Sequence, residues 1–285
     1  MIFSASLWLN LNMLIKSYGH SDVGRRREKN EDAFLVNDER RLYLVADGMG
    51  GHLGGEFASK LAVATIDEVI KALEEDPETT LPEGESMKPG DFSNCLRYAI
   101  REASRRIFEK ATEDANLHGM GTTTVALLFR NNKAYVANVG DSRVYRIRGK
   151  KINQITKDHS LVGEQIRAGL LSADDSRAHR LKNIITRSVG FQETVDSDVD
   201  IRAVRTGDKF LLCTDGLSNL LEDGEIRDIV VNNELEAAVK RLVDIANERG
   251  GDDNITAILT EVVDVDVPSE AKSASPDDDT TLDMG

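Results

Sequence analysis

The most regular feature of the chain is a set of short apolar runs that each meet an aspartate. Residues 42–46 are all apolar, and Asp47 follows them, with glycines at positions 48, 50, 51, 54 and 55. A second run, residues 210–213, leads to Asp215, and Asp253 stands just before a third run at residues 255–262. Runs of this length predict buried strands. One Asp-Gly pair alone is more often an ordinary turn, but a carboxylate at the end of a buried strand, beside glycines that let the backbone bend closely, suits a hard cation.

Between these runs the pattern alternates between strands and amphipathic helices. Apolar residues at helical spacing predict helices over residues 55–73, 96–111 and 235–246. Short stretches rich in β-branched or aromatic residues, joined by polar turns, predict further strands at residues 33–36, 122–129, 134–139 and 144–148. Clustered strands with helices between them are compatible with many folds and do not single out one.

Other segments lack periodicity and set the limits of the domain. Residues 74–90 are acidic and rich in Pro and Gly, which indicates a loop, and residues 160–187 are mixed and polar, which indicates a short helix with a loop. Residues 265–285 are dominated by Ser, Pro and Asp, a composition typical of a disordered tail. Residues 1–16 are apolar without a basic start or a clear cleavage site. We therefore favour a flexible extension, or translation that begins at Met13, over a weak signal-like segment. The predicted folded domain covers residues 17–264.

Composition narrows the class of protein. The 285 residues are 40% hydrophobic and 30% charged, which suits a globular protein with a sizeable core. The formal net charge of −14 disfavours binding to nucleic acid or to an anionic membrane, and no apolar run reaches the roughly 20 residues of a membrane span. With Cys95 and Cys213 as its only cysteines, the chain indicates neither a disulfide framework nor a zinc site, and we expect it in the reducing cytoplasm.

The aspartates suggest a metal centre if their strands are neighbours. Asp47, Asp215 and Asp253 would then converge at one rim of the fold; Asp141, after another strand, is a fourth candidate, and Glu31 with Asp32 is a fifth group. Carboxylates without His or thiolate partners favour Mg²⁺ or Mn²⁺ over zinc or copper. Two such ions about 4 Å apart are the usual apparatus for hydrolysing a phosphate ester.

Three consecutive arginines, at positions 25–27, stand just before Glu31. The planar fork of an arginine suits a phosphate dianion, so one of them could grip a substrate phosphate. For three adjacent arginines in isolation, a solvated basic run is the default interpretation.

With these motifs in order, the chain resembles the metal-dependent Ser/Thr protein phosphatases of the protein phosphatase 2C family, particularly the compact bacterial type. The resemblance extends from about residue 18 to residue 262, and no single block would be specific without the others. The blocks are Ser21-Asp22-Val23-Gly24 through Arg27 to Asn30-Glu31-Asp32; Ala46-Asp47-Gly48-Met49-Gly50-Gly51-His52; Gly121-Thr122-Thr123; Asn138-Val139-Gly140-Asp141-Ser142-Arg143; Asp158-His159-Ser160-Leu161; Ile185-Thr186-Arg187; Thr214-Asp215-Gly216-Leu217; and Gly251-Asp252-Asp253-Asn254.

The resemblance implies an α+β fold, a four-layer α-β-β-α sandwich of two antiparallel sheets flanked by helices. It also implies roles for the acidic residues. Asp47 would bridge two Mn²⁺ or Mg²⁺ ions, with the Gly48 carbonyl on one of them, while Asp215 and Asp253 would complete the first site. Glu31 and Asp32 would hold metal-bound waters, and Asp141 with Asp215 would bind a third, weaker ion.

Two further assignments follow from the same resemblance. Arg27, five residues before Asp32, matches the arginine that grips the phosphate, whereas Arg25 and Arg26 do not. His52 follows Asp-Gly-Met-Gly-Gly, while animal members place a proposed general acid directly after the Asp-Gly pair. His52 could protonate the leaving alkoxide or simply hydrogen-bond a loop, and both interpretations remain open. Residues 160–187 match the family's flap, a variable segment that influences substrate choice.

The expected activity is hydrolysis of phosphoserine and phosphothreonine in proteins by metal-activated water, in opposition to a Ser/Thr kinase in signalling. We expect a monomer that acts on phosphorylated proteins, the kinase and its substrates among them. The alternatives are a catalytically silent pseudophosphatase, which binds a phosphoprotein or a kinase, and a phosphoesterase for small molecules. The presence of Asp47, Asp215 and Asp253 argues against the silent form.

Overall fold

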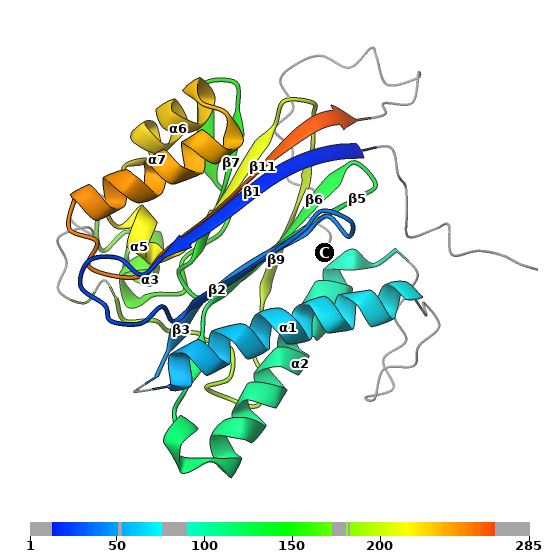
Figure 1. The fold of residues 1–285 in the computed structure, drawn as a ribbon. Helices are drawn as coiled ribbons and strands as arrows, with labels where there is room; N and C mark the ends of the chain where they lie inside the picture. Colours follow the sequence, from blue (N-terminus) through cyan, green and yellow to red (C-terminus); the bar gives the residue numbers. More distant parts are fainter. Residues whose placement is uncertain (1–12, 51–52, 76–89, 173–180, 182, 266–285) are drawn as a thin grey trace, which may run out of the picture.

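The strands of the chain pair into two antiparallel sheets (Figure 1). The computed structural model describes residues 13–50, 53–75, 90–172, 181 and 183–265. The first sheet has the order β1-β11-β10-β7-β8, and its strands are β1 (Met13–Asp22), β11 (Ile255–Val265), β10 (Lys209–Cys213), β7 (Arg143–Arg148) and β8 (Lys151–Gln154). The second has the order β2-β3-β5-β6-β9 with β4 paired to β3, and its strands are β2 (Asp32–Asn37), β3 (Leu42–Met49), β4 (Gly121–Thr122), β5 (Thr124–Arg130), β6 (Lys133–Val139) and β9 (Asp198–Ala203).

Helices cover the outer face of each sheet, which confirms the predicted four-layer α-β-β-α sandwich (Figure 1). Helices α1 (Gly54–Glu75) and α2 (Phe92–Glu113) pack on the second sheet, and α6 (Asp223–Asn232) and α7 (Leu235–Glu248) pack on the first. The shorter helices are η2 (Ala115–Leu117), α3 (Leu161–Arg167) and α5 (Asp215–Ser218). The apolar faces predicted for the helices near residues 55–73, 96–111 and 235–246 are the faces that meet the sheets.

Large side chains from both sheets fill the space between them. Tyr43 on β3, Phe129 on β5 and Phe210 on β10 are fully buried there. The ring centroids of Tyr43 and Phe129 are 6.0 Å apart, and those of Phe129 and Phe210 are 5.4 Å apart, both with edge-to-face geometry. This row of rings joins the two sheets, so the strand ends that carry the aspartates are held on one scaffold.

The structure corrects the predicted start of the domain. Strand β1 begins at Met13 and pairs with β11 along its length, with Met13 opposite Val265, so residues 13–16 form part of a sheet and not of an extension. The apolar pattern missed β1 because most residues of this strand are only half-buried and the strand includes a glycine and a histidine. It also missed β8, β9 and α6. Residues 1–12 and the predicted tail over residues 266–285 lie outside the described part of the chain.

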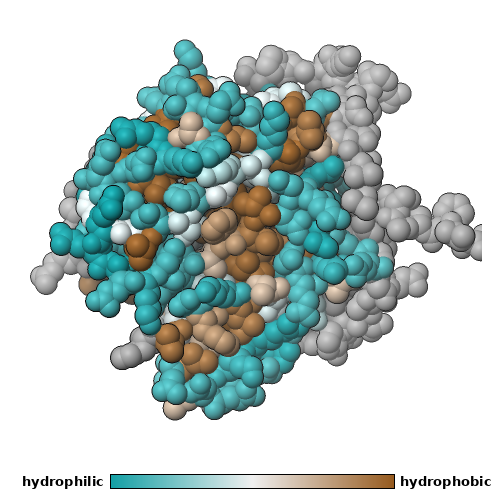
Figure 2. Space-filling model, viewed as in Figure 1, coloured by the Kyte–Doolittle hydropathy of each residue, from teal (hydrophilic) through white to brown (hydrophobic). Residues whose placement is uncertain are grey.

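Apolar residues gather on the surface where β1, β2 and α1 lie side by side (Figure 2). An open groove there is lined by Phe34 and Leu35 of β2 and by Val63 and Ala64 of α1. Strand β2 is at the edge of its sheet and pairs with β3 alone among the described strands. The groove is therefore exposed apolar surface at an open sheet edge. None of the helices in the described ranges combines the length and the apolar character needed to cross a membrane.

The row of rings between the sheets gives a test of the fold. Replacing the fully buried ring in Phe129→Ala would leave a cavity against Tyr43 and Phe210. We expect the free energy of unfolding to fall by about 3–5 kcal/mol, measured by urea denaturation. Phe191, which is 64% exposed, provides the control, since Phe191→Ala should change stability by no more than about 0.5 kcal/mol. Equal losses in the two variants would contradict this account of the core.

Candidate metal centre

The ends of four strands place the predicted aspartates at one rim of the sandwich. Asp32, the first residue of β2, lies opposite Asp47 in the pairing of β2 with β3. Asp215 begins α5 directly after β10, and Asp253 stands just before β11. Because β10 and β11 pair antiparallel, with Cys213 opposite Ala257, these two aspartates lie at the same end of the first sheet.

Electrostatics shows how closely these carboxyls are grouped. Burial raises the pKa of Asp47 well above its ordinary value, and repulsion from Asp32, Asp215, Asp141 and Asp253 raises it further. The structure therefore brings together all five aspartates that the sequence singled out. Their mutual repulsion is the kind of environment that a bound cation relieves.

Two of the other carboxyls show the same effect. Burial raises the pKa of Asp32 to about 7, with further contributions from Asp215 and Asp253, although hydrogen bonds from the hydroxyls of Thr256 and Thr214 oppose the shift. Burial also raises the pKa of Asp141 to about 8, with repulsion from Asp215 as the next cause. Burial is again the main reason that the pKa of Glu31 is raised, while the charge of Arg27 opposes that shift.

Close backbone packing holds Glu31 against the end of β3. The Gly48 N–H donates to the Glu31 carbonyl at 3.2 Å, and the Ser59 hydroxyl of α1 donates to the same oxygen at 2.5 Å. A Cβ atom at Gly48 would lie 2.1 Å from the carbonyl oxygen of Gly55, so only glycine fits between β3 and the start of α1. The predicted Gly-rich turn after Asp47 thus lets two elements approach, and Gly51 within it lies outside the described residues.

One side chain next to Asp253 ties down the arginine-bearing loop. The Asn254 amide nitrogen donates to the carbonyls of Val23 and Lys29, both at 2.9 Å, and its oxygen accepts the Glu31 N–H at 2.8 Å. Asn254 therefore holds both ends of the segment that carries Arg27 and presents Glu31 to the centre. Asn254 directly follows Asp253 in the sequence, but no local pattern predicts that it holds this loop.

Of the three adjacent arginines, only Arg27 contacts one of the clustered aspartates. Its guanidinium donates to Asp253 Oδ2 at 2.8 Å while remaining half-exposed. Arg26 instead lies 3.7 Å from Asp252 at the exposed surface. The side chains of Arg27 and Arg26 therefore have different partners, and the phosphate-binding role of Arg27 stays a prediction.

The donor set suits a hard divalent cation. It consists of carboxylates and backbone carbonyls, and Asp32 Oδ1 is buried without a hydrogen-bond partner in the described structure. Within the described ranges, no three His, Cys, Asp or Glu side chains are arranged around a common metal position in their present conformations. Asp253 accepts from Arg27 and from the Asn254 N–H, and Asp215 accepts from the Asn219 amide at 3.0 Å. The residues fit a metal centre, provided that these carboxylates turn from their protein donors to the ions.

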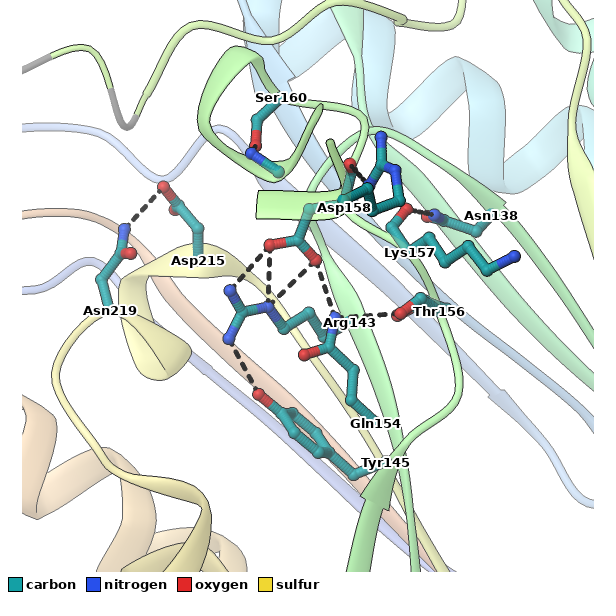
Figure 3. Close-up of polar contacts among 12 residues, drawn as sticks. Asn138, Arg143, Tyr145, Gln154, Thr156, Lys157, Asp158, Ser160, Asp215 and Asn219 are labelled. Atoms are coloured by element: carbon teal, nitrogen blue, oxygen red, sulfur yellow. Dashed lines mark hydrogen bonds and ion pairs between the residues drawn. The ribbon is translucent and has the colours of Figure 1, made fainter. Parts of the chain in front are cut away.

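A cavity of about 340 Å³ opens beside Asp141 and Asp215, between α3 and α5. Figure 3 shows Arg143 and Asp158 paired in its wall, with the guanidinium donating to the carboxylate and to the Tyr145 hydroxyl. The cavity is bounded on one side by part of the predicted flap, because Ser160, Val162 and Ile166 also line it.

The flap is anchored at its base. The Leu161 N–H donates to the Ile184 carbonyl at 2.9 Å, and the Thr186 N–H donates to the His159 carbonyl at 2.8 Å. The His159 N–H in turn donates to the carbonyl of Gly140, next to Asp141. The His159 side chain is buried. Residues 173–180 and 182 of the flap, like His52, lie outside the described part of the chain.

The raised carboxyl pKa values predict how the metal-free protein responds to pH. A carboxyl whose pKa is higher in the folded state than its unfolded value of 3.8 binds more protons when folded, so it stabilises at low pH and that stability is lost as pH rises. With folded values of about 7 for Asp32 and about 8 for Asp141, the loss falls between about pH 4 and pH 8.

Thermal unfolding in EDTA at pH 5.5 and pH 8 measures this loss. We expect a lower thermal midpoint at pH 8 than at pH 5.5, and a smaller difference between the two midpoints in Asp141→Asn. Addition of Mn²⁺ should raise the midpoint more at pH 8 than at pH 5.5, since metal competes with protons for carboxylates. A midpoint in EDTA that rises with pH over this range would contradict the clustering.

Comparison with known proteins gives a consistent result. The family model described as Protein phosphatase 2C matches residues 20–260. The Serine/threonine phosphatase stp of Listeria welshimeri is 37% identical over 245 residues, which cover 85% of this chain and 93% of that protein.

Solved structures agree with the sequence comparison. The serine/threonine phosphatase Stp1 from Staphylococcus aureus superposes with a TM-score of 0.78 at 32% identity, covering 88% of this chain and 96% of the other. The catalytic domain of the serine/threonine protein phosphatase PstP, in complex with two manganese ions, has a TM-score of 0.76 at 32% identity, covering 88% of this chain and all of that domain. The expected family and its Mn²⁺ or Mg²⁺ dependence are thereby confirmed: this chain belongs to the protein phosphatase 2C family of metal-dependent serine/threonine phosphatases.

Proposed function

We propose that this phosphatase removes phosphate from phosphoserine and phosphothreonine in proteins and so opposes a Ser/Thr kinase in signalling. The observation that carries the proposal is the group of five mutually repelling aspartates at one rim of the sandwich, of which Asp32 and Asp141 are buried, next to a half-exposed arginine. Listeria Stp, named a serine/threonine phosphatase, supports the choice of amino-acid substrate.

The residues of the cluster divide into three roles in this proposal. Asp47, with the Gly48 carbonyl, Asp215 and Asp253 would hold two Mn²⁺ or Mg²⁺ ions, and Asp141 with Asp215 would hold a third. Glu31 and Asp32 would orient water beside these ions. When bound, such ions lower the pKa of water and offset charge on phosphoryl oxygens.

The chain's own residues bind the substrate and order the attack. Arg27 would grip the phosphate through its guanidinium fork. The oxygen of one water forms a bond to phosphorus while the bond from phosphorus to the seryl or threonyl oxygen breaks. A proton lost by the water balances the one that the released alkoxide gains, and the products are inorganic phosphate and the free hydroxyl.

The setting of the enzyme belongs to the same proposal. We infer a cytoplasmic monomer; the cytoplasmic setting is supported by Cys95 and Cys213, which are buried and form no disulfide in the described structure. The presence of Asp47, Asp215 and Asp253 in the sequence argues against a silent pseudophosphatase. The name of the Listeria relative favours a protein substrate over a small molecule.

Hydrolysis of a phosphothreonine peptide tests the metal assignment. We expect phosphate release with Mn²⁺, none with EDTA, and a loss of more than about 100-fold in kcat/KM for Asp215→Asn, because one ligand and its charge are removed. The control is Asp244→Asn on α7, an exposed carboxyl outside the cluster that should leave the rate unchanged. A folded wild-type protein without turnover under either metal would favour the pseudophosphatase.

Arg27 makes a separable prediction about substrate binding. Removing one charged, bidentate partner of a phosphate should lower kcat/KM by about 10- to 100-fold in Arg27→Ala, mostly through a higher KM, with Arg27→Lys in between. Arg26→Ala is the matched control, since the Arg26 side chain is exposed and lies 3.7 Å from exposed Asp252. Equal effects at the two positions would show that the arginines act through general charge alone.

A further inference from the structure

The two carboxylate oxygens of Asp32 have very different surroundings. Oδ2 accepts hydrogen bonds from the Thr256 hydroxyl at 2.6 Å and from the Thr214 hydroxyl at 3.1 Å. Oδ1 is equally buried, but no donor in the described structure bonds to it. Both threonines are fully buried, so this asymmetry is built into the interior and does not depend on mobile surface groups.

The direction of each hydrogen bond follows from the number of protons available. Thr214 Oγ1 already accepts the Thr256 N–H at 3.0 Å, so its own proton is the one given to Asp32. Thr256 gives its single proton to Asp32, so Ser21, 2.7 Å away, must be the donor to Thr256. Ser21 in turn accepts from the Asn30 amide at 2.8 Å. Every hydroxyl in this chain of hydrogen bonds, that is, those of Ser21, Thr256 and Thr214, therefore donates its proton in the direction of Asp32.

The hydroxyl chain also joins the two sheets. Asp32 lies on β2 in the second sheet, opposite Asp47. Ser21 on β1, Thr256 on β11 and Thr214 at the end of β10 belong to the first sheet. The position of the Asp32 carboxylate relative to Asp47 is thus fixed from across the sandwich.

We propose that Thr214 and Thr256, supported by Ser21, are positioning residues that hold Oδ2 of Asp32 and so keep Oδ1 available to orient the attacking water. This role rests on the proposed function, in which Asp32 acts on water. Arg27 lies on the loop between β1 and β2, which Asn254 holds through the carbonyls of Val23 and Lys29. Because Thr214 and Thr256 lie outside that loop, loss of their hydroxyls should slow the chemical step more than it weakens the grip on the substrate.

The plainer interpretation is that the hydroxyls only satisfy a buried carboxylate and stabilise the fold. Both interpretations predict a less stable protein when a hydroxyl is removed. They differ in kinetics, since a purely structural contact leaves kcat per folded molecule unchanged.

Kinetics of Thr256→Val and Thr214→Val separates the two, because valine keeps the shape of threonine without its hydroxyl. With saturating Mn²⁺ and a phosphothreonine peptide, we expect kcat to fall about tenfold or more while KM changes less than about threefold. Thr256→Ser, which keeps the hydroxyl, should return kcat to within about threefold of wild type. Thr260→Val is the matched control, a buried threonine on the same strand whose hydroxyl donates to the Phe210 carbonyl at 3.5 Å, and it should keep the wild-type kcat.

A measurement without metal tests the contact itself. In EDTA, Thr256→Val should lower the thermal midpoint of the otherwise wild-type protein by about 3 °C. The same substitution made in Asp32→Ala should lower the midpoint by less than half as much, because the hydroxyl has already lost its acceptor. Equal shifts in both backgrounds, or a wild-type kcat in both valine variants, would overturn the inference. An inactive wild-type enzyme that still shows the coupling would instead overturn the proposed function, and the catalytic part of this role with it.

Discussion

Mutual repulsion among closely placed carboxylates is the constraint on which the rest of this structure depends. Burial and repulsion from four other aspartates both raise the pKa of Asp47, so its charged form is costly unless protons or cations neutralise the charge. A fold can hold such a cluster only if stronger interactions elsewhere fix the backbone. The sandwich supplies these interactions as two sheets joined by Tyr43, Phe129 and Phe210, so the strand ends cannot move apart to relieve the repulsion.

Uncharged groups position the backbone and the side chains around the aspartates. Gly48 lets the end of β3 approach α1, Asn254 holds both ends of the arginine-bearing loop, and the hydroxyls of Thr214 and Thr256 bond to Asp32. Each of these groups adds order without adding charge. A lysine or arginine in the same place would neutralise the carboxylates permanently and remove their affinity for a divalent ion.

The sequence could predict the aspartates but not the groups that support them. Asp47, Asp215 and Asp253 stood out because each meets an apolar run, a local pattern that needs no knowledge of pairing. Which strands are neighbours depends on contacts between distant residues, so the sequence alone could not show that the aspartates lie together. The pairing of β10 with β11 shows this for Asp215 and Asp253. Asp32 and Thr256 are 224 residues apart, and no local pattern announces a bond between them. Strand β1 was missed for a related reason, since its half-buried residues gain their order from β11.

Asp253 connects the two functions that the proposal assigns to the rim. Its carboxylate accepts from Arg27, while its backbone neighbour Asn254 holds the loop on which Arg27 is carried. A change at Asp253 would therefore disturb the metal site, the partner of Arg27 and the loop at once. The Asp215 carboxylate instead accepts a hydrogen bond from the Asn219 amide at 3.0 Å, one turn further along the chain. Loss of the carboxylate at Asp215 therefore reports on metal binding with less interference from substrate binding, whereas a defect at Asp253 would not distinguish the two.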